Sequence, residues 1–364
     1  FKKGIGLATQ TGDLLKKSDL LNENAKLYID LYETTLGEVF LKNALTLQKQ
    51  FAGRRAVLLA YLELGSMYYT NSEYQKSIEM LLNALQIGEK YNAEGNIYAL
   101  ILLTKSYVAI NDNNNAIKYA LDAHKCVKSL KDKSLESLVF HELANVYGLN
   151  GDTEKAMYFY QLAIEKAQYS MAKLTFLNSL GDFYFRLGNL SEAQKTLDEA
   201  LKTSKEKFFN LQNYVIYQKA ITSLTRGKIF LNQRDYKNAD RCFKESLATY
   251  KNYEIIDLQA EVLFYRAKLF LEKGNFKEAE KNIRESIELR ELIGENLAVQ
   301  DLQLFFLTTL ENHYNLYIEL LVKRWRISKK DSDLKAALTI VEKSKTRILS
   351  RTLSNYSGNT TFKK

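Results

Sequence analysis

The stretch "LGDFYFRLGNLSEAQKTLDEAL", residues 180–201, places small residues at Gly181, Ala193 and Ala200. A glycine inside a helix costs about 1 kcal/mol relative to alanine, so a position that keeps one indicates a need for space. Small residues at offsets of twelve and nineteen from Gly181 would let two neighbouring amphipathic helices meet closely. We therefore predict a helical hairpin in which Gly181 and Ala193 meet where the two helices cross closely.

The same spacing recurs along most of the chain, which indicates an internal repeat. Each repeat has an anchor residue in its first helix, a Tyr or Phe at +3, and a small residue at both +12 and +19. Successive anchors lie 37 to 46 residues apart and are Ala25, Gly65, Thr104, Ala144, Gly181, Gly227 and Ala267. Because such a repeat spans one hairpin, the sequence predicts an all-α solenoid of about seven hairpins.

Composition and turn signals favour the same fold. The chain has 364 residues and no proline, and an interior proline would remove a helical hydrogen bond and clash with the preceding turn. Short turn sequences separate the two helices of a repeat, such as "NGD" at 150–152, "LGN" at 187–189 and "KGN" at 273–275. These features predict long uninterrupted helices joined by tight turns.

The repeat resembles the tetratricopeptide repeat (TPR) over residues 20 to about 295. The family's Leu-Gly, Tyr and Ala positions are present in "LELGSMYY" (62–69), "LGDFYF" (180–185) and "RAKLFLEKGNFKEAEKNI" (266–283). The resemblance implies a right-handed superhelical solenoid with a concave groove lined by the first helix of each hairpin. The chain departs from the family pattern in its period near 40 residues and in lacking the closing proline.

The repeat pattern ends after Ile293, and a longer C-terminal hairpin is expected to cap the solenoid. We predict a solenoid at 1–296, a capping hairpin at 297–353 and a flexible tail or linker at 354–364. The apolar face expected to pack on the last repeat carries Leu334, Leu338, Val341, Ser344 and Ile348.

The segment "AALTIVEKSKTRIL" (336–349) resembles the helix that ends the TPR region of CHAT proteins. That resemblance implies a caspase-like protease domain downstream, which is not within these 364 residues.

Positive charge gathers on the C-terminal hairpin. Residues 323–351 contain ten basic and three acidic residues, whereas the chain before residue 323 has no net charge, so nucleic acid is an unlikely partner of the solenoid. One interpretation is a docking face for an acidic neighbour or a following domain, and the other is a solvated, solubilising cap. The candidate docking residues are Lys343, Lys345, Arg347 and Arg351.

A concave groove suits a protein or peptide partner. The resemblance places the groove wall three residues before, one after, and four or five after each anchor. The candidate groove residues are Lys105, His141, Asn145, Asn178, Asp182, Arg186, Lys228 and Lys268. The alternative is that these positions are polar only because exposed helix positions usually are.

No motif points to catalysis, a cofactor or a metal. His124 and Cys126 lie two residues apart on one helix, where their side chains diverge, so they make a poor catalytic pair. Two cysteines in so long a chain favour a reducing, cytoplasmic location, and no apolar run reaches the roughly 18 residues of a membrane span. We therefore expect no enzyme and no membrane partner. The open hypotheses are the partner-sensing region of a CHAT-type protease and a free-standing TPR adaptor or peptide sensor.

Overall fold

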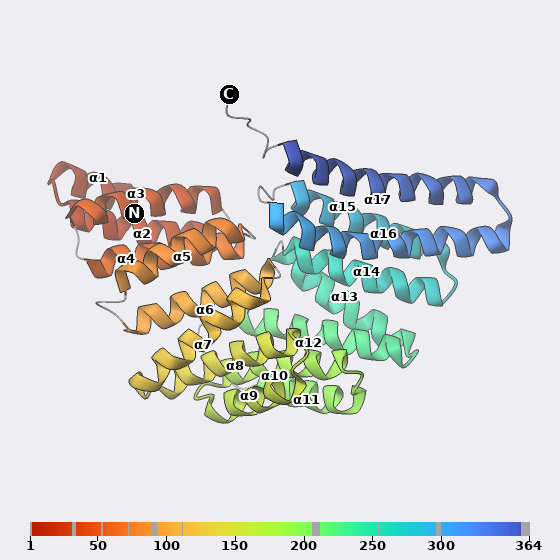
Figure 1. Ribbon diagram of the computed structural model, residues 1–364, viewed down its shortest axis with the longest axis horizontal. Helices are drawn as coiled ribbons and strands as arrows, with labels where there is room; N and C mark the ends of the chain where they lie inside the picture. The colour runs from red at the N-terminus through yellow and green to blue at the C-terminus, as the bar shows by residue number, and fades with distance from the viewer. Residues whose placement is uncertain are drawn as a thin grey trace. The chain divides into compact units, whose positions relative to one another are not determined.

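The computed structural model describes residues 2–30, 34–51, 54–71, 73–88, 93–110, 112–205, 212–253, 255–295 and 300–357. These residues form 17 helices and no strand, which confirms the all-α prediction. The chain divides into two compact units, Phe1–Gln168 and Tyr169–Lys364, and each is described by itself (Figure 1).

Every predicted hairpin is present, and in each one an A helix packs against the B helix that follows it. A short helix, α1 (Lys2–Gln10), precedes them. The pairs are α2 (Leu14–Asp30) with α3 (Thr34–Phe51), α4 (Arg54–Thr70) with α5 (Tyr74–Gly88), α6 (Ala93–Ala109) with α7 (Asn113–Leu130), α8 (Lys133–Leu149) with α9 (Thr153–Lys166), α10 (Ser170–Arg186) with α11 (Leu190–Thr203), α12 (Gln212–Asn232) with α13 (Tyr236–Asn252), and α14 (Ile256–Glu272) with α15 (Phe276–Glu295).

The anchor glycines mark the close crossing of A and B helices, as predicted, but the bulk that they accommodate comes from a different position. A Cβ on Gly181 would lie 2.6 Å from Cδ2 of Leu197, and a Cβ on Gly227 would lie 2.5 Å from Cε1 of Phe243. Both partners are sixteen residues after the anchor, not twelve. The glycine therefore makes room for a large B-helix side chain.

The small residues at +12 and +19 bring the B-helix backbone against the A helix. Ser77, at +12, donates a 2.7 Å hydrogen bond from its Oγ to the carbonyl oxygen of Gly65. At +19, Ser246 donates at 2.8 Å to the carbonyl of Ala220, and Ser286 donates at 2.5 Å to that of Ala260. The +19 residue thus contacts the residue seven positions before the anchor. The two offsets correspond to two points of contact along one hairpin.

The four fully described turns between A and B helices each use one residue with positive φ followed by an N-cap. Gly188 has a φ of 76°, and the side chain of Asn189 then accepts a hydrogen bond from the backbone N–H of Glu192. Gly151 and Gly274 adopt the same conformation, whereas the hairpin of α12 and α13 has Arg234 there, with a φ of 61°. Glycine adopts positive φ without a steric penalty, which explains the "NGD", "LGN" and "KGN" signals.

The terminal hairpin consists of α16 (Gln300–Ser328) and α17 (Asp331–Ser357). The prediction that Leu334 and Leu338 of α17 pack on the last repeat is wrong, because they are 37% and 58% exposed while Ala337 is buried. Val341 and Ser344 are partly buried, and the side chain of Ile348 lies outside those that the structure describes. The helix turns Ala337 and Asp333 inward, since Asp333 pairs with Arg324 of α16. The predicted boundary at 296/297 lies outside the described residues, as does the tail after 357, so these limits remain predictions.

Candidate functional site

Successive A helices lie side by side within each unit and form the wall on which the groove was predicted. In the first unit α4 contacts α6 and α6 contacts α8; in the second, α10 contacts α12, α12 contacts α14 and α14 contacts α16. The predicted groove residues divide between the two units, with Lys105, His141 and Asn145 in the first and the other five in the second.

In the first unit, two predicted residues meet around a carboxylate that sequence reasoning missed, and a third bonds to the next helix. Lys105 of α6 lies 3.2 Å from Oε1 of Glu142 on α8, and Nδ1 of His141 lies 3.2 Å from the same oxygen. Asn145 accepts a 2.6 Å hydrogen bond from the Tyr160 hydroxyl of α9. These contacts bind α6, α8 and α9 together.

Glu142 is ionised in this buried position. Burial alone would raise the pKa of its carboxyl group, but the charge of Lys105 and the hydrogen bond from His141 lower that pKa to about 2. A buried carboxylate of this kind requires its cation, because an isolated charge in the protein interior is very costly. Lys105 thus forms an ion pair within the chain, whether or not it also contacts a binding partner.

In the second unit, a line of polar side chains joins α10 to α12. The Nδ2 of Asn178 donates to the Oε1 of Gln218 at 2.9 Å and to its carbonyl oxygen at 3.1 Å. The Oδ1 of Asn178 accepts a 2.6 Å hydrogen bond from the hydroxyl of Thr222. Asn178 is only 3% exposed. Both ends of its side-chain amide are therefore hydrogen-bonded to neighbouring residues of the wall.

Lys228 of α12 connects three A helices through its ammonium group. Its Nζ lies 2.7 Å from Oε1 of Glu261 on α14 and 3.7 Å from Oδ1 of Asp182 on α10, and 5.0 Å from the centre of the Tyr265 ring. Burial alone would lower the pKa of Lys228, but the charges of Glu261 and Asp182 more than offset this and raise it. Reciprocally, burial would raise the pKa of Glu261, but Lys228 lowers it. Both groups are charged.

The structure separates the eight predicted groove residues into two classes. His141, Asn178 and Lys228 are buried, so their predicted exposure on a groove is wrong, because their polar atoms hold neighbouring helices together. The side chains that remain at least partly exposed are Lys105, Asn145, Asp182, Arg186 and Lys268. Of these, Arg186 forms a 3.1 Å ion pair with Asp182 one turn away. Partner contact by the exposed residues remains a prediction.

Sequence reasoning missed Glu142, Glu261 and Gln218, which complete the buried pairs. Each lies in a helix among apolar neighbours, as in "FHELANVY" (140–147). A buried charged residue is rare unless it is paired. A charged or amide residue among apolar neighbours in the sequence was therefore the available signal of a buried pair. Its partner could not be identified, because that partner lies about forty residues away at no fixed spacing.

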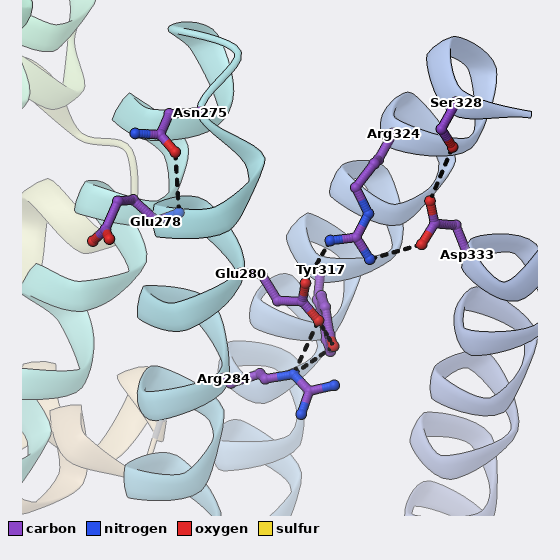
Figure 2. A network of polar contacts seen from close by, with 8 residues as sticks. All are labelled: Asn275, Glu278, Glu280, Arg284, Tyr317, Arg324, Ser328 and Asp333. Carbon is purple, nitrogen blue, oxygen red and sulfur yellow. Dashed lines mark hydrogen bonds and ion pairs between the residues drawn. The ribbon is translucent and has the colours of Figure 1, made fainter. Parts of the chain in front are cut away.

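At the other candidate site, a polar network fixes the terminal hairpin to the last repeat (Figure 2). Glu280 of α15 accepts hydrogen bonds from Tyr317 at 2.8 Å and from Arg324 at 2.5 Å, both on α16. Arg324 also donates at 2.8 Å to Asp333 in the first turn of α17. The Arg324 guanidinium thus joins three helices. Burial would raise the pKa of Glu280, but these hydrogen bonds and the charge of Arg324 lower it.

The predicted docking face is only partly described. Lys343 lies 2.9 Å from Oε1 of Glu291 on α15, so it is not a purely outward-facing cation as predicted, because its position on α17 faces the last repeat. Lys345 is exposed. The side chains of Arg347 and Arg351 lie outside those that the structure describes.

The surroundings of His124, Cys126 and Cys242 in the structure do not point to a catalytic centre. His124 packs against Phe140 and Phe159. Burial raises the pKa of the Cys126 thiol and of the buried Cys242 thiol, which disfavours the reactive thiolate form. Among the described residues, no group of three or more His, Cys, Asp or Glu could hold a metal ion. No helix in this part of the chain is both long and apolar enough to cross a membrane.

Comparison with known proteins supports the repeat assignment. Family models of the tetratricopeptide repeat match residues 174–207 and 224–290. The matched residues include most of the fifth, sixth and seventh hairpins. TPR-type repeats are therefore found in the second unit. These matches do not show a link to CHAT proteins.

Several solved structures have a similar fold. The apo form of RapI gives a TM-score of 0.60 at 14% identity, covering 77% of this chain and 100% of that chain. A STAND signal-transduction ATPase with a tetratricopeptide repeat sensor, from Pyrococcus horikoshii, gives 0.57 at 14% identity; 96% of this chain aligns with 53% of it. The apo form of the quorum sensor NprR from B. thuringiensis gives 0.51 at 14% identity, covering 92% and 99%. These similarities confirm the predicted all-α solenoid fold class.

Proposed function

We propose that this protein is a non-catalytic interaction scaffold that binds a peptide or a segment of another protein on the A-helix wall. The observation that carries the proposal is the bonding between neighbouring A helices by buried polar pairs such as Lys228 with Glu261 and Asn178 with Gln218. These pairs hold the wall in a fixed shape, and a preformed surface binds with less loss of conformational entropy. Exposed Arg186 and Lys268 on the same helices supply charged contacts for carboxylates of the partner.

The similar folds support a sensing role. NprR is described as a quorum sensor, and the Pyrococcus horikoshii protein contains a tetratricopeptide repeat sensor. By this analogy the partner is a signal whose binding is passed on to another protein. A free-standing sensor or adaptor would carry out this function without a further domain on the same chain.

The test compares charge reversal on the A-helix wall with an equal reversal on the B helices. Arg186→Glu with Lys268→Glu changes exposed residues of α10 and α14, whereas Lys202→Glu with Lys237→Glu makes the same charge change on α11 and α13. Each chain is cross-linked in lysate of the source cells, and bound partners are quantified by mass spectrometry. We expect the A-helix variant to lose its main partner and the B-helix variant to retain it. Equal retention by both variants would overturn the assignment of the binding face.

A more specific version is that this chain is the sensing region of a CHAT-type protease. Its support is the resemblance of "AALTIVEKSKTRIL" (336–349) to the helix before the caspase-like domain, together with the fixed attachment of α17 to the last repeat through Arg324. Reading the gene beyond codon 364 tests this version directly. A strand-rich domain with a histidine followed by a cysteine supports it, and a stop codon or an unrelated domain rejects it.

A further inference from the structure

The turn that joins α16 and α17 forms a basic tip with an exposed apolar side chain. Its sequence is "KRWRISKK", residues 323–330. Helix α16 has 29 residues against 17 in α14, and the turn lies beyond the ends of the neighbouring helices of its unit (Figure 1). Ile327 is 74% exposed, the largest exposed fraction of any large apolar side chain in the described part of the chain. The tip therefore combines several cations with an exposed aliphatic side chain.

Three exposed cations lie within three residues of Ile327 in the sequence. Arg326, Lys329 and Lys330 are exposed, and within the described residues none of them forms an ion pair. Lys329 lies over the ring of Trp325, with Nζ 5.3 Å from its centre. The exposed Asp331 is the acidic residue next in sequence, so the tip carries a positive charge overall.

The tip is held in one conformation by the network that fixes the terminal hairpin. Asp333 accepts hydrogen bonds from Arg324 at 2.8 Å and from the Ser328 hydroxyl at 3.3 Å (Figure 2). The Ser328 Oγ in turn accepts a 3.2 Å hydrogen bond from the backbone N–H of Lys330. Lys329, with a φ of 55°, donates its N–H to the carbonyl of Trp325 at 2.7 Å. The backbone that carries these cations and Ile327 is thus fixed by hydrogen bonds.

We propose that this tip binds the surface of an anionic phospholipid bilayer, with Ile327 and the edge of Trp325 entering the headgroup region. Basic side chains are attracted to anionic lipids, and aliphatic and indole groups partition into the interface beside them. The turn of a hairpin presents a small surface, whereas a specific protein interface buries roughly 1,200 to 2,000 Å². A fluid bilayer instead adapts to a narrow tip. Such peripheral contact needs no membrane-spanning helix, so the lack of an apolar run does not argue against it.

The proposal is independent of the A-helix wall, and the experiment uses a different readout. Trp325 is the only tryptophan of the chain, so its fluorescence reports directly on the tip. The protein is titrated with vesicles of phosphatidylcholine alone and with vesicles of phosphatidylcholine mixed with phosphatidylserine. We expect co-sedimentation and a blue shift of Trp325 emission with the mixed vesicles only, both weakening as salt is raised.

Two variants and matched controls decide the assignment. Ile327→Ser and the pair Arg326→Glu with Lys330→Glu should each reduce the apparent affinity for the mixed vesicles by about tenfold or more. Leu187→Ser removes another exposed apolar side chain, and Lys277→Glu with Lys281→Glu makes the same charge change on α15; these controls should bind as the unmodified chain does.

Two results would overturn the proposal. If the tip variants and the controls bind the vesicles equally, attraction is spread over the protein and the tip has no special role. If soluble polyglutamate shifts Trp325 emission as strongly as the mixed vesicles and competes with them, the tip recognises an acidic polypeptide rather than a bilayer.

Discussion

At the level of single residues, Gly181 is a position where the fold leaves no room for a side chain. An alanine Cβ there would lie 2.6 Å from Leu197 Cδ2 and 2.8 Å from its Cγ. Alanine gains about 1 kcal/mol in helix propensity, but overpacking in a filled core costs typically 1 to 3 kcal/mol. We expect Gly181→Ala to lower the free energy of unfolding by about 1 kcal/mol, and Gly181→Leu by more, in urea titrations.

A double-mutant cycle with Leu197→Ala separates steric conflict from other effects. Shortening Leu197 removes the atoms that a Cβ at Gly181 would meet. In that background Gly181→Ala is expected to cost nothing, or to stabilise the helix through its propensity. Strictly additive effects of the two substitutions would contradict the crossing described for α10 and α11.

Glu142 makes the first unit sensitive to acid. Its pKa is lowered from an ordinary value of 4.5 to about 2, so the ionised form stabilises the folded chain. That contribution is fully present above pH 4.5 and is lost as the pH falls from about 4.5 to about 2. Over this range we expect the unmodified chain to lose up to about 3 kcal/mol more unfolding free energy than Glu142→Gln.

Unfolding by urea at a series of pH values measures this difference. Glu154→Gln removes an exposed carboxylate of α9 and controls for net charge. A constant gap between the unmodified chain and Glu142→Gln across the acid range would show that Glu142 does not titrate as described.

Small residues at helix crossings were easier to predict from the sequence than polar residues that form buried pairs. Gly181 and Ala193 could be identified because the same offsets recur in every repeat. Lys228 was assigned to a groove because its polarity suggested exposure, whereas it is 9% exposed and lies between two carboxylates. A single sequence records that a residue is polar, but not which distant residue neutralises it.

At the level of elements, the turn between α12 and α13 has a residue that its conformation disfavours. Arg234 has a φ of 61°, where the hairpin of α14 and α15 has Gly274 at 72°. Residues with a Cβ pay roughly 1 kcal/mol or more for the left-handed conformation. We therefore expect Arg234→Gly to raise the free energy of unfolding by about 0.5 to 1 kcal/mol, despite glycine's greater unfolded-state entropy.

The reverse change at an equivalent turn is the control for this prediction. No atom lies within 4 Å of a Cβ built on Gly274, so Gly274→Ala tests the backbone conformation alone. Its melting temperature should fall. A rise after Gly274→Ala, or a fall after Arg234→Gly, would show that the conformation of these turns is not what limits their stability.

Arg324 joins α17 to α15 and α16 through its guanidinium group. It bonds to Glu280 of α15 and to Asp333 of α17. Arg324→Leu leaves Asp333 without this partner and leaves Glu280 with Arg284 as its cation. We expect amide hydrogen exchange over 331–345 to speed up while that of α14 is unchanged. Lys323→Leu is the matched control, because the Lys323 ion pair with Glu319 lies within α16. Equal effects of the two substitutions would contradict the role given to Arg324.

Helix boundaries and partners were predictable to different extents. The glycine turns and capping residues located the ends of α9, α10 and α14 in the sequence, because each signal acts within a few residues. The positions of Leu334 and Leu338 on α17 were predicted wrongly, since leucines at helical spacing normally point to a core. Asp333, in the first turn of α17, instead faces α16 and pairs with Arg324. The apolar pattern of one helix does not record such a partly buried ion pair with another.

At the level of the whole molecule, the chain consists of two compact units, 1–168 and 169–364. Each contains complete hairpins and its own buried core, with Leu64 and Leu81 in the first and Phe243 and Leu263 in the second. Helical repeats are stabilised mainly by contacts with their immediate neighbours. We therefore expect fragments 1–168 and 169–364, produced separately, each to be helical and to melt cooperatively.

Circular dichroism and thermal melts of the two fragments check this expectation. A fragment that is helical but melts without cooperativity would show that its core is incomplete alone. The number of hairpins was predictable from the periodic anchors, but the division into units was not. The sequence around 166–169, "KAQY", has none of the Gly, Pro or Ser enrichment that marks a linker.

The hydroxyl-to-carbonyl contacts of Ser246 and Ser286 join positions at the same offset in consecutive hairpins. Because the anchors Gly227 and Ala267 are 40 residues apart, duplicating the gene segment that encodes one such repeat would give each copy its own hydroxyl-to-carbonyl contact. Unequal crossing-over between neighbouring repeats would therefore yield longer or shorter chains that still fold. The length of the proposed binding wall could therefore change during evolution by whole hairpins, using the same kinds of contact as before.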